Sequence, residues 1–165
     1  MAVSTEDFLQ GMRRLGGAVT IVSVADGDTW AGLTATAVTS LSAEPPRLLA
    51  CINRAGASFE TLSRGRKLAV NVLGLEHQNL AMRFAGMDGV AETNRFDMGN
   101  WQLGALGVPY LADALVSFEC EVSSILDAGS HGIVIGDIAV VHTSPNEAQR
   151  PLFYMDGKWA SLSGS

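Results

Sequence analysis

Short apolar runs rich in Val, Ile and Leu, separated by Gly, Asp and Asn, divide most of this chain into β-strands. The turn sequences Asp26-Gly27-Asp28 and Asp156-Gly157 each lie between two such runs and predict β-hairpins. The segments predicted as strands are residues 19–25, 30–41, 47–53, 67–73, 115–126, 133–142, 153–155 and 159–162.

Helical periodicity is confined to a few short segments. Ser4 is a helix-capping residue, and Phe8, Met12 and Leu15 recur on one face of the helix predicted over residues 4–15. Shorter helices are predicted over residues 58–63 and 76–85, followed by an irregular, Gly-rich segment at 86–107 that is long enough for a functional loop. Several strands with interspersed short helices favour a mainly β, α+β fold, an antiparallel barrel decorated by helices.

Composition narrows the class of protein. The 165 residues are 47% hydrophobic and only 17% charged, which indicates one compact domain over residues 1–165. The net charge of −6 argues against a nucleic-acid partner, and no apolar stretch approaches the ~20 residues of a membrane span. The polar, acidic N-terminus is unlike a signal peptide, and Cys51 and Cys120 are interpreted as reduced core residues, so a cytoplasmic location is expected.

Residues 32–46 are the segment whose composition points to chemistry. In one continuous strand over 30–41, alternate side chains share a face, and small side chains would let a flat ligand approach the backbone. A Thr-rich strand that turns its hydroxyls to water is the alternative, and the pattern alone leaves both open. One face would carry Thr34, Thr36, Val38, Ser40 and Ser42, and the other Leu33, Ala35, Ala37, Thr39 and Leu41.

A second candidate lies where a predicted strand ends and a helix begins, in Asn53-Arg54-Ala55-Gly56-Ala57-Ser58. Small residues, a hydroxyl and a fixed cation at a helix start suit a phosphate group. An ordinary strand-to-helix turn with Asn and Ser as caps would have the same composition.

Several common motifs are missing from the chain. Neither a Gly-x-Gly-x-x-Gly turn nor a Gly-x-x-x-x-Gly-Lys-[Ser/Thr] loop occurs, so a nicotinamide nucleotide would have to bind outside a Rossmann domain. His77, His131 and His142 lack metal-ligand spacing, so no metal site is expected.

Landmarks along residues 14–159 resemble the flavin reductase-like family in order and spacing. Ser130 stands where many members have an aspartate beside the histidine. The residues that carry the resemblance are Thr34-Ala35, Thr39-Ser40-Leu41-Ser42, Pro45-Pro46, Arg83-Phe84-Ala85, Asn94-Arg95-Phe96, Trp101, Gly107-Val108-Pro109, Ala114-Leu115 and Gly129-Ser130-His131.

This resemblance implies an antiparallel Greek-key split β-barrel that forms a homodimer. It also implies an NAD(P)H:flavin oxidoreductase that transfers a hydride from NADH or NADPH to FMN or FAD, supplying reduced flavin to a partner monooxygenase. His131 is implied on the nicotinamide side of the site as its catalytic residue. The implied flavin contacts are Thr34, Ala35, Thr36, Thr39, Ser40, Leu41, Ser42, Asn53, Arg54, Ala57, Ser58, Arg83 and Phe84.

Alternatives remain for single residues and for the function of the protein. Phe84 could instead pack in the core, and His131 could be an ordinary turn residue at the start of a strand. The protein could pass electrons through a bound flavin to another acceptor, such as the cobalt of a corrin ring. It could also be a flavin-binding module without turnover.

Overall fold

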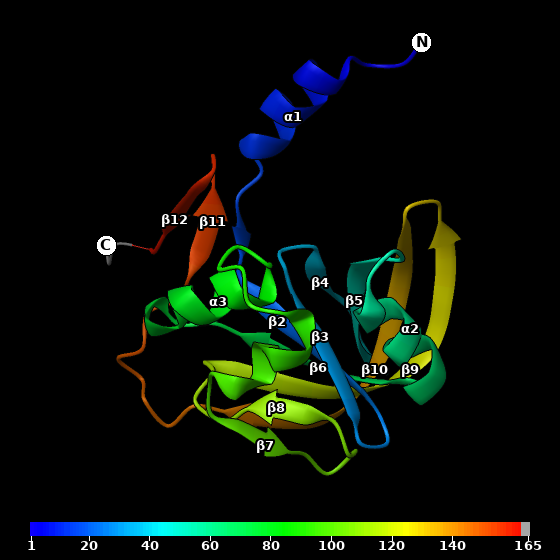
Figure 1. Ribbon diagram of the computed structural model, residues 1–165, viewed down its shortest axis with the longest axis vertical. Coiled ribbons are helices and arrows are strands. Elements are labelled where there is room, and N and C mark those ends of the chain that lie inside the picture. The colour runs from blue at the N-terminus through cyan, green and yellow to red at the C-terminus, as the bar shows by residue number, and fades with distance from the viewer. Residues whose placement is uncertain (163–165) are drawn as a thin grey trace.

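A seven-stranded antiparallel sheet forms the body of the protein in the computed structural model, which describes residues 1–162 (Figure 1). The strands follow the order β3-β2-β6-β9-β10-β5-β4, and each neighbouring pair is antiparallel. The mainly β, α+β class expected from the sequence is therefore confirmed. The strands are β2 (Thr20–Asp26), β3 (Thr29–Ala35), β4 (Val38–Ala43), β5 (Pro46–Asn53), β6 (Lys67–Val72), β9 (Val116–Ala128) and β10 (His131–Thr143).

The continuous strand predicted over residues 30–41 is wrong. The chain leaves the sheet at Thr36 and Ala37, so β3 and β4 are separate strands at opposite edges of the sheet. We call residues 36–37 the crossover. β3 pairs with β2 through a hairpin, whereas β4 pairs with β5. Because the two halves of the predicted strand have different partners, they form separate strands. The four hydroxyl side chains predicted on one face therefore do not share a strand: Thr34 lies on β3, Thr36 in the crossover, and Ser40 and Ser42 on β4.

Within residues 1–162, three α-helices accompany the sheet. α1 (Thr5–Arg13) begins as predicted, with the Ser4 hydroxyl accepting a hydrogen bond from the Asp7 amide, and it extends away from the sheet (Figure 1). α2 (Ala57–Gly65) follows β5, and α3 (Gln78–Phe84) follows the 3-10 turn η1 (Leu75–His77). None of the helices in residues 1–162 is long and apolar enough to cross a membrane.

Small elements complete the fold. The segment predicted as irregular contains the 3-10 helix η2 (Glu92–Asp97) and β7 (Trp101–Leu103), which pairs with β8 (Pro109–Leu111). The predicted C-terminal hairpin is confirmed as β11 (Phe153–Met155) and β12 (Lys158–Ala160), and β1 (Gly17–Ala18) pairs with β11. Positive φ angles of 53° at Asp156 and 71° at Gly157 are those that a two-residue hairpin turn requires.

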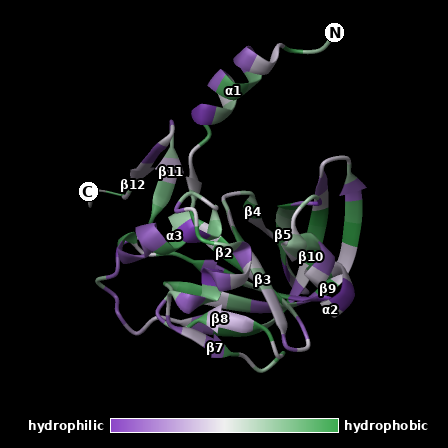
Figure 2. Ribbon diagram, viewed as in Figure 1, coloured by the Kyte–Doolittle hydropathy of each residue, from purple (hydrophilic) through white to green (hydrophobic). Residues whose placement is uncertain are grey.

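The core has two main parts. One lies between the sheet and α2, where Ile52, Leu62 and Val134 are fully buried, and the other lies beneath α3. Apolar colour follows the central strands in Figure 2, while α1 carries both apolar and polar colour and contributes no buried residue. Cys120 is buried and Cys51 is half-buried, and both are free thiols.

Two buried polar side chains attach the β7–β8 hairpin to the sheet. The side-chain Oδ1 of Asn71 accepts a hydrogen bond from the Leu111 amide at 2.8 Å. The Glu119 carboxylate, fully buried, accepts one from the Leu106 amide at 2.8 Å and contacts Nε2 of His142 at 2.6 Å. Because buried polar groups are costly unless they are paired, these contacts define where the hairpin sits.

Candidate functional site

Strand register brings together three segments that are far apart in the sequence. The Cys51 amide donates to the carbonyl of Ala37 at 2.9 Å, so the crossover runs beside the end of β5. Two residues further along β5, Asn53 is paired with His131, the first residue of β10. The crossover, the loop between β5 and α2, and the β9–β10 turn thus meet at one end of the sheet.

The β3 side of this site is held by hydroxyls that already have partners. Thr34 donates to the carbonyl of Ala81 at 2.6 Å, which ties β3 to α3, and Thr20 donates to the carbonyl of Ala35 at 2.7 Å. Thr36, in contrast, is exposed at the crossover. Of the predicted contacts at Thr34, Ala35 and Thr36, Thr36 is the one that is exposed.

The β4 side is a sheet edge with a bulge. Register shifts between Ser40 and Ser42, which makes Leu41 the extra residue of a β-bulge, a feature common at sheet edges and near functional sites. Thr39 and Ser40 are exposed, and the Ser42 hydroxyl donates to the carbonyl of Pro45 at 2.6 Å. An open pocket of about 280 Å³ at this edge is lined by Thr39, Ser40 and Ser42 together with Ala18, Thr20, Val38, Arg47, Leu48, Val70, Val72, Phe118 and Ile138.

The loop between β5 and α2 leaves hydrogen-bond donors unused. The Asn53 side chain accepts a hydrogen bond from the Ala55 amide at 2.9 Å and closes a local turn, but the N-cap of α2 is Gly56, so no side chain caps the helix. The Ser58 hydroxyl is buried and has no hydrogen-bond partner. Uncapped amides and an orphaned hydroxyl in the first turn, which begins at Ala57, are the donors that a phosphate would satisfy.

The Arg54 guanidinium is directed at the β9–β10 turn. Its Nη1 lies 2.8 Å from Oδ2 of Asp127 and donates to the carbonyl of Gly129 at 3.2 Å. The guanidinium carbon also lies 5.8 Å from the centre of the Phe59 ring. Hydrogen bonds from the Gly129 amide and then from Arg54 lower the pKa of Asp127 below its usual value of 3.8. The predicted phosphate cation is therefore engaged with a carboxylate.

His131 is exposed at the end of that same turn. Its Nδ1 lies 2.9 Å from the Ser130 hydroxyl, so the serine that stands in place of the family's aspartate still contacts the ring. Gly132 follows, and a Cβ there would lie 2.5 Å from the Phe59 ring. Close packing of Phe59 on Gly132 holds α2 against the start of β10.

Arg83 and Phe84 are both engaged by other parts of the protein and are not free to contact a ligand at the crossover. Arg83 Nε donates to Asp88 at 2.8 Å, and this bond is the main reason why the pKa of Asp88 lies below 3.8. Phe84 is 1% exposed and packs edge-on against Phe96 at 5.0 Å between ring centres. Phe84 offers no surface to a ligand here, so the core-packing alternative describes its position.

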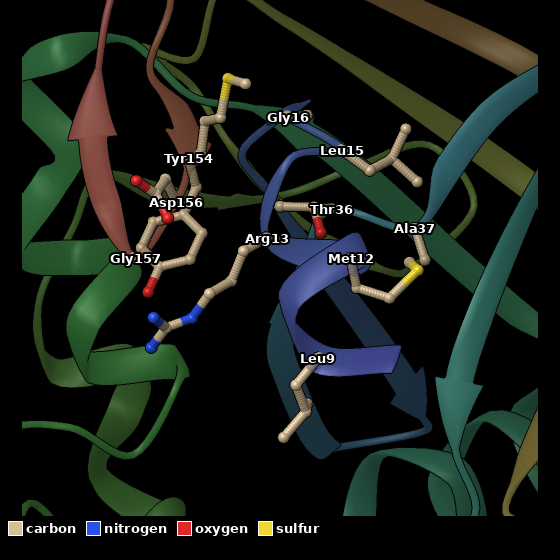
Figure 3. A pocket seen from close by; sticks show the side chains of 12 residues that line it. Leu9, Met12, Arg13, Leu15, Gly16, Thr36, Ala37, Tyr154, Asp156 and Gly157 are labelled. Atoms are coloured by element: carbon tan, nitrogen blue, oxygen red, sulfur yellow. The ribbon is translucent and has the colours of Figure 1, made fainter. Parts of the chain in front are cut away.

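A further pocket of about 420 Å³ lies between α1, the crossover and the C-terminal hairpin (Figure 3). The α1 and hairpin residues that line it are not among the predicted site residues, although the apolar face of α1 was the available signal. It is lined by Leu9, Met12, Arg13, Leu15, Gly16, Gly17, Thr36, Ala37, Tyr154, Met155, Asp156 and Gly157. Since Thr36 and Ala37 line it, this pocket is continuous with the crossover side of the site.

Comparison with known proteins connects this geometry to a family. Residues 12–163 match the family described as "Flavin reductase like domain". The "FMN reductase (NADH) RutF 2" of Rhizobium rhizogenes is 36% identical over 157 residues, covering 95% of this chain and 88% of the relative.

Two solved structures extend the comparison. BorF, the flavin reductase component of a bacterial two-component tryptophan halogenase, superposes with a TM-score of 0.86 at 28% identity, covering 98% of this chain and 100% of BorF. The NADH:FAD oxidoreductase SgcE6 of Streptomyces globisporus, in complex with NAD and FAD fragments, has a TM-score of 0.86 at 27% identity and covers 100% of this chain and 98% of its own.

Proposed function

The chain belongs to the flavin reductase-like family, and from that premise we infer that it is an oxidoreductase that reduces flavin with a nicotinamide nucleotide. The observation that carries this function is 36% identity with an FMN reductase (NADH) over 95% of the chain. That relative supports FMN and NADH as the substrates. The likeness to an NADH:FAD oxidoreductase supports FAD as a second acceptor.

The unused donors of the site fit a flavin nucleotide. We propose that the first-turn amides of α2 at Ala57 and Ser58, with the Ser58 hydroxyl, hold the flavin phosphate, because these donors lack partners in the structure. Thr36 and the open edge of β4 at Thr39–Ser42 would face the ring. Backbone amides at such an edge can stabilise negative charge on the ring's pyrimidine side.

A flavin bound there would accept a hydride at N5 from C4 of the nicotinamide, whose C–H bond would break to leave the oxidised nucleotide, and a proton from water would complete the reduced flavin. Such a transfer depends on close stacking more than on acid or base groups. We propose that the exposed imidazole of His131, oriented by Ser130, positions the nicotinamide ring. Arg83 would act through its ion pair with Asp88, by fixing the loop that follows α3.

We propose that the protein is a homodimer of one domain over residues 1–165. Support comes from α1, which buries none of its residues and leaves Phe8, Leu9 and Met12 each about half exposed. A nine-residue helix is marginal in water unless its apolar face is covered, so a second copy is the occupant we expect. We further propose a cytoplasmic location, which the two free cysteines support.

We propose an oxygenase or a related flavin-dependent enzyme as the consumer of reduced flavin, supported by the likeness to the reductase component of a two-component halogenase. The pocket at the β4 edge is open and includes the small side chains of Thr39, Ser40 and Ser42, which would let reduced flavin leave for that partner.

The test is NADH oxidation by the purified protein, followed by the absorbance of NADH with and without added FMN, FAD or riboflavin. We expect oxidation that rises and saturates with FMN. A matched variant, Ser58→Ala, should weaken FMN binding and leave riboflavin binding unchanged, since riboflavin lacks the phosphate. The loss should be about 1.5–3 kcal/mol, as for a hydrogen bond to a charged group. Flavin binding without NADH or NADPH oxidation would instead identify a non-catalytic module.

A further inference from the structure

Arg54 links the loop before α2 to the turn that carries His131. Its backbone amide donates to the Ser130 carbonyl at 3.0 Å, and its guanidinium contacts Asp127 and the Gly129 carbonyl at 2.8 and 3.2 Å. Backbone and side chain of one residue thus hold three of the four residues that precede His131. We propose, building on the proposed function, that Arg54 and Asp127 are positioning residues for His131 and that Arg54 does not bind the flavin phosphate.

The contacts form a continuous path to the imidazole. Oδ1 of Asp127 accepts the Gly129 amide at 2.9 Å, so the carboxylate that holds Arg54 also closes the turn. Gly129, with φ at 76°, leads into Ser130, whose hydroxyl lies 2.9 Å from Nδ1 of His131. Release of Asp127 or Arg54 would therefore loosen the turn whose last hydroxyl orients the ring.

Charge argues against Arg54 as the phosphate ligand. Asp127 cancels the charge of the guanidinium and would repel an approaching phosphate unless Arg54 left the turn. The Phe59 ring beside Arg54 and the Gly129 carbonyl hold the guanidinium toward β10. The uncapped amides of α2 supply a phosphate site without this cation.

The ion pair between Arg54 and Asp127 is exposed, so we expect it to fix the geometry of the turn more than it stabilises the fold. The side chains of Arg54 and Asp127 are 42% and 69% exposed, and exposed pairs contribute little to stability. Substitution of either residue should therefore leave the melting temperature close to that of the wild type. Its effect should appear in the placement of His131 and in the reaction with NADH.

The experiment compares Arg54→Ala, Asp127→Ala and the double variant. Anaerobic rapid mixing gives the rate constant for flavin reduction by NADH, and flavin fluorescence gives the dissociation constants of FMN and riboflavin. We expect each single variant to lower the apparent second-order reduction rate roughly tenfold, because hydride transfer is sensitive to small displacements. The double variant should lose no more than either single variant, and the FMN dissociation constant should stay unchanged.

If Arg54 were instead a phosphate ligand, Arg54→Ala and Asp127→Ala would change FMN affinity in opposite directions. Arg54→Ala would weaken FMN but not riboflavin, whereas Asp127→Ala would free the cation and tighten FMN. That pair of results would overturn the proposal. Arg64→Ala and Glu60→Ala are the matched controls for the reduction rate and for hydrogen exchange, because they remove the same charges from an exposed ion pair within α2, at 2.6 Å. For FMN affinity Arg64→Ala alone is the control, since Glu60 lies in the first turn of α2.

A second measurement separates this proposal from the proposed function. If the wild type reduces no flavin, the proposed function fails, but hydrogen exchange still reports on the turn. Arg54→Ala and Asp127→Ala should each speed exchange at residues 129–131, while the Arg64 and Glu60 controls leave it unchanged. Arg54→Lys keeps the charge but cannot reach two acceptors in the same fork geometry, so exchange should be as fast as in Arg54→Ala. Unchanged protection in all three variants would refute the positioning role.

Discussion

At the scale of single residues, the pair formed by Ser130 and His131 shows how a hydroxyl can perform an orienting task. A serine hydroxyl can donate to or accept from Nδ1, so it can hold the ring in either protonation state, whereas a carboxylate favours the protonated one. In this structure the hydroxyl lies 2.9 Å from Nδ1, and the exposed ring leaves Nε2 available to a ligand.

His131→Ala should raise the KM for NADH or slow flavin reduction, lowering kcat/KM roughly tenfold or more because near-attack geometry is strict. Flavin affinity should be nearly unchanged. Ser130→Ala is the graded control: it keeps the imidazole and removes its partner, so its effect should be smaller than that of His131→Ala. Anaerobic stopped-flow titration with NADH measures both. Equal rates in His131→Ala and wild type would return His131 to the turn-residue alternative.

Cys120 gives a residue-scale prediction about pH. Burial, followed by the charges of Asp137 and Glu119, raises the pKa of its thiol from 9.0 to about 12. Between these pH values the unfolded chain loses the proton and the folded protein keeps it, so the free energy of unfolding must fall as pH rises. Urea unfolding at several alkaline pH values should show a shallower decline for Cys120→Ala than for the wild type. Parallel declines would contradict the shift.

At the scale of elements, α2 depends on a close approach to the end of β2. A Cβ at Gly65, the last residue of α2, would lie 1.8 Å from the backbone oxygen of Ala25. Neither backbone can move without shifting a helix or a strand. The absence of a side chain at Gly65 therefore sets how closely α2, and with it the first turn that we propose binds phosphate, docks on the sheet.

Gly65→Ala should lower the free energy of unfolding by about 1–3 kcal/mol or more, the usual cost of overpacking a tight contact. Urea unfolding followed by circular dichroism measures the loss. Gly11→Ala is the matched control, because Gly11 also lies in a helix but a Cβ there meets no atom within 4 Å. Similar stabilities for the two variants would mean that α2 can relax away from β2.

At the scale of the whole molecule, the exposed apolar face of α1 adjoins the pocket beside the crossover. Leu9 and Met12 line that pocket together with Thr36 and Ala37, so whatever covers α1 also borders the proposed flavin site. Association of two copies through this face would bury the apolar side chains and enclose the site at the same time.

Leu9→Ser combined with Met12→Ser should shift sedimentation velocity from a dimer toward a monomer and should weaken FMN binding. Burial of a large apolar side chain contributes about 1.5–3 kcal/mol, so two such losses change a dimer's dissociation constant by orders of magnitude. Gln10→Ser, on the same helix, is the polar control. A dimer that persists in the double variant would place the interface elsewhere.

Much of this protein was predictable from local patterns. The capped α1, the strands on either side of Asp26–Asp28 and the C-terminal hairpin with its Asp156-Gly157 turn all follow from residues adjacent in sequence. The family is likewise readable from motifs over most of the chain. Such features depend on contacts within a few positions, which is the range over which side-chain periodicity and turn chemistry act.

Only the tertiary structure decided three other points: the break between β3 and β4, the burial of Phe84 and the engagement of Arg54 with Asp127. Each depends on partners that are distant in the sequence. A run of small residues has the same alternation whether it forms one strand or two, because alternation records which face a residue takes and not which strand it pairs with. The sequence by itself therefore determined most of the elements and the residue types they carry, whereas long-range pairing determined where the 30–41 segment divides and which residues meet.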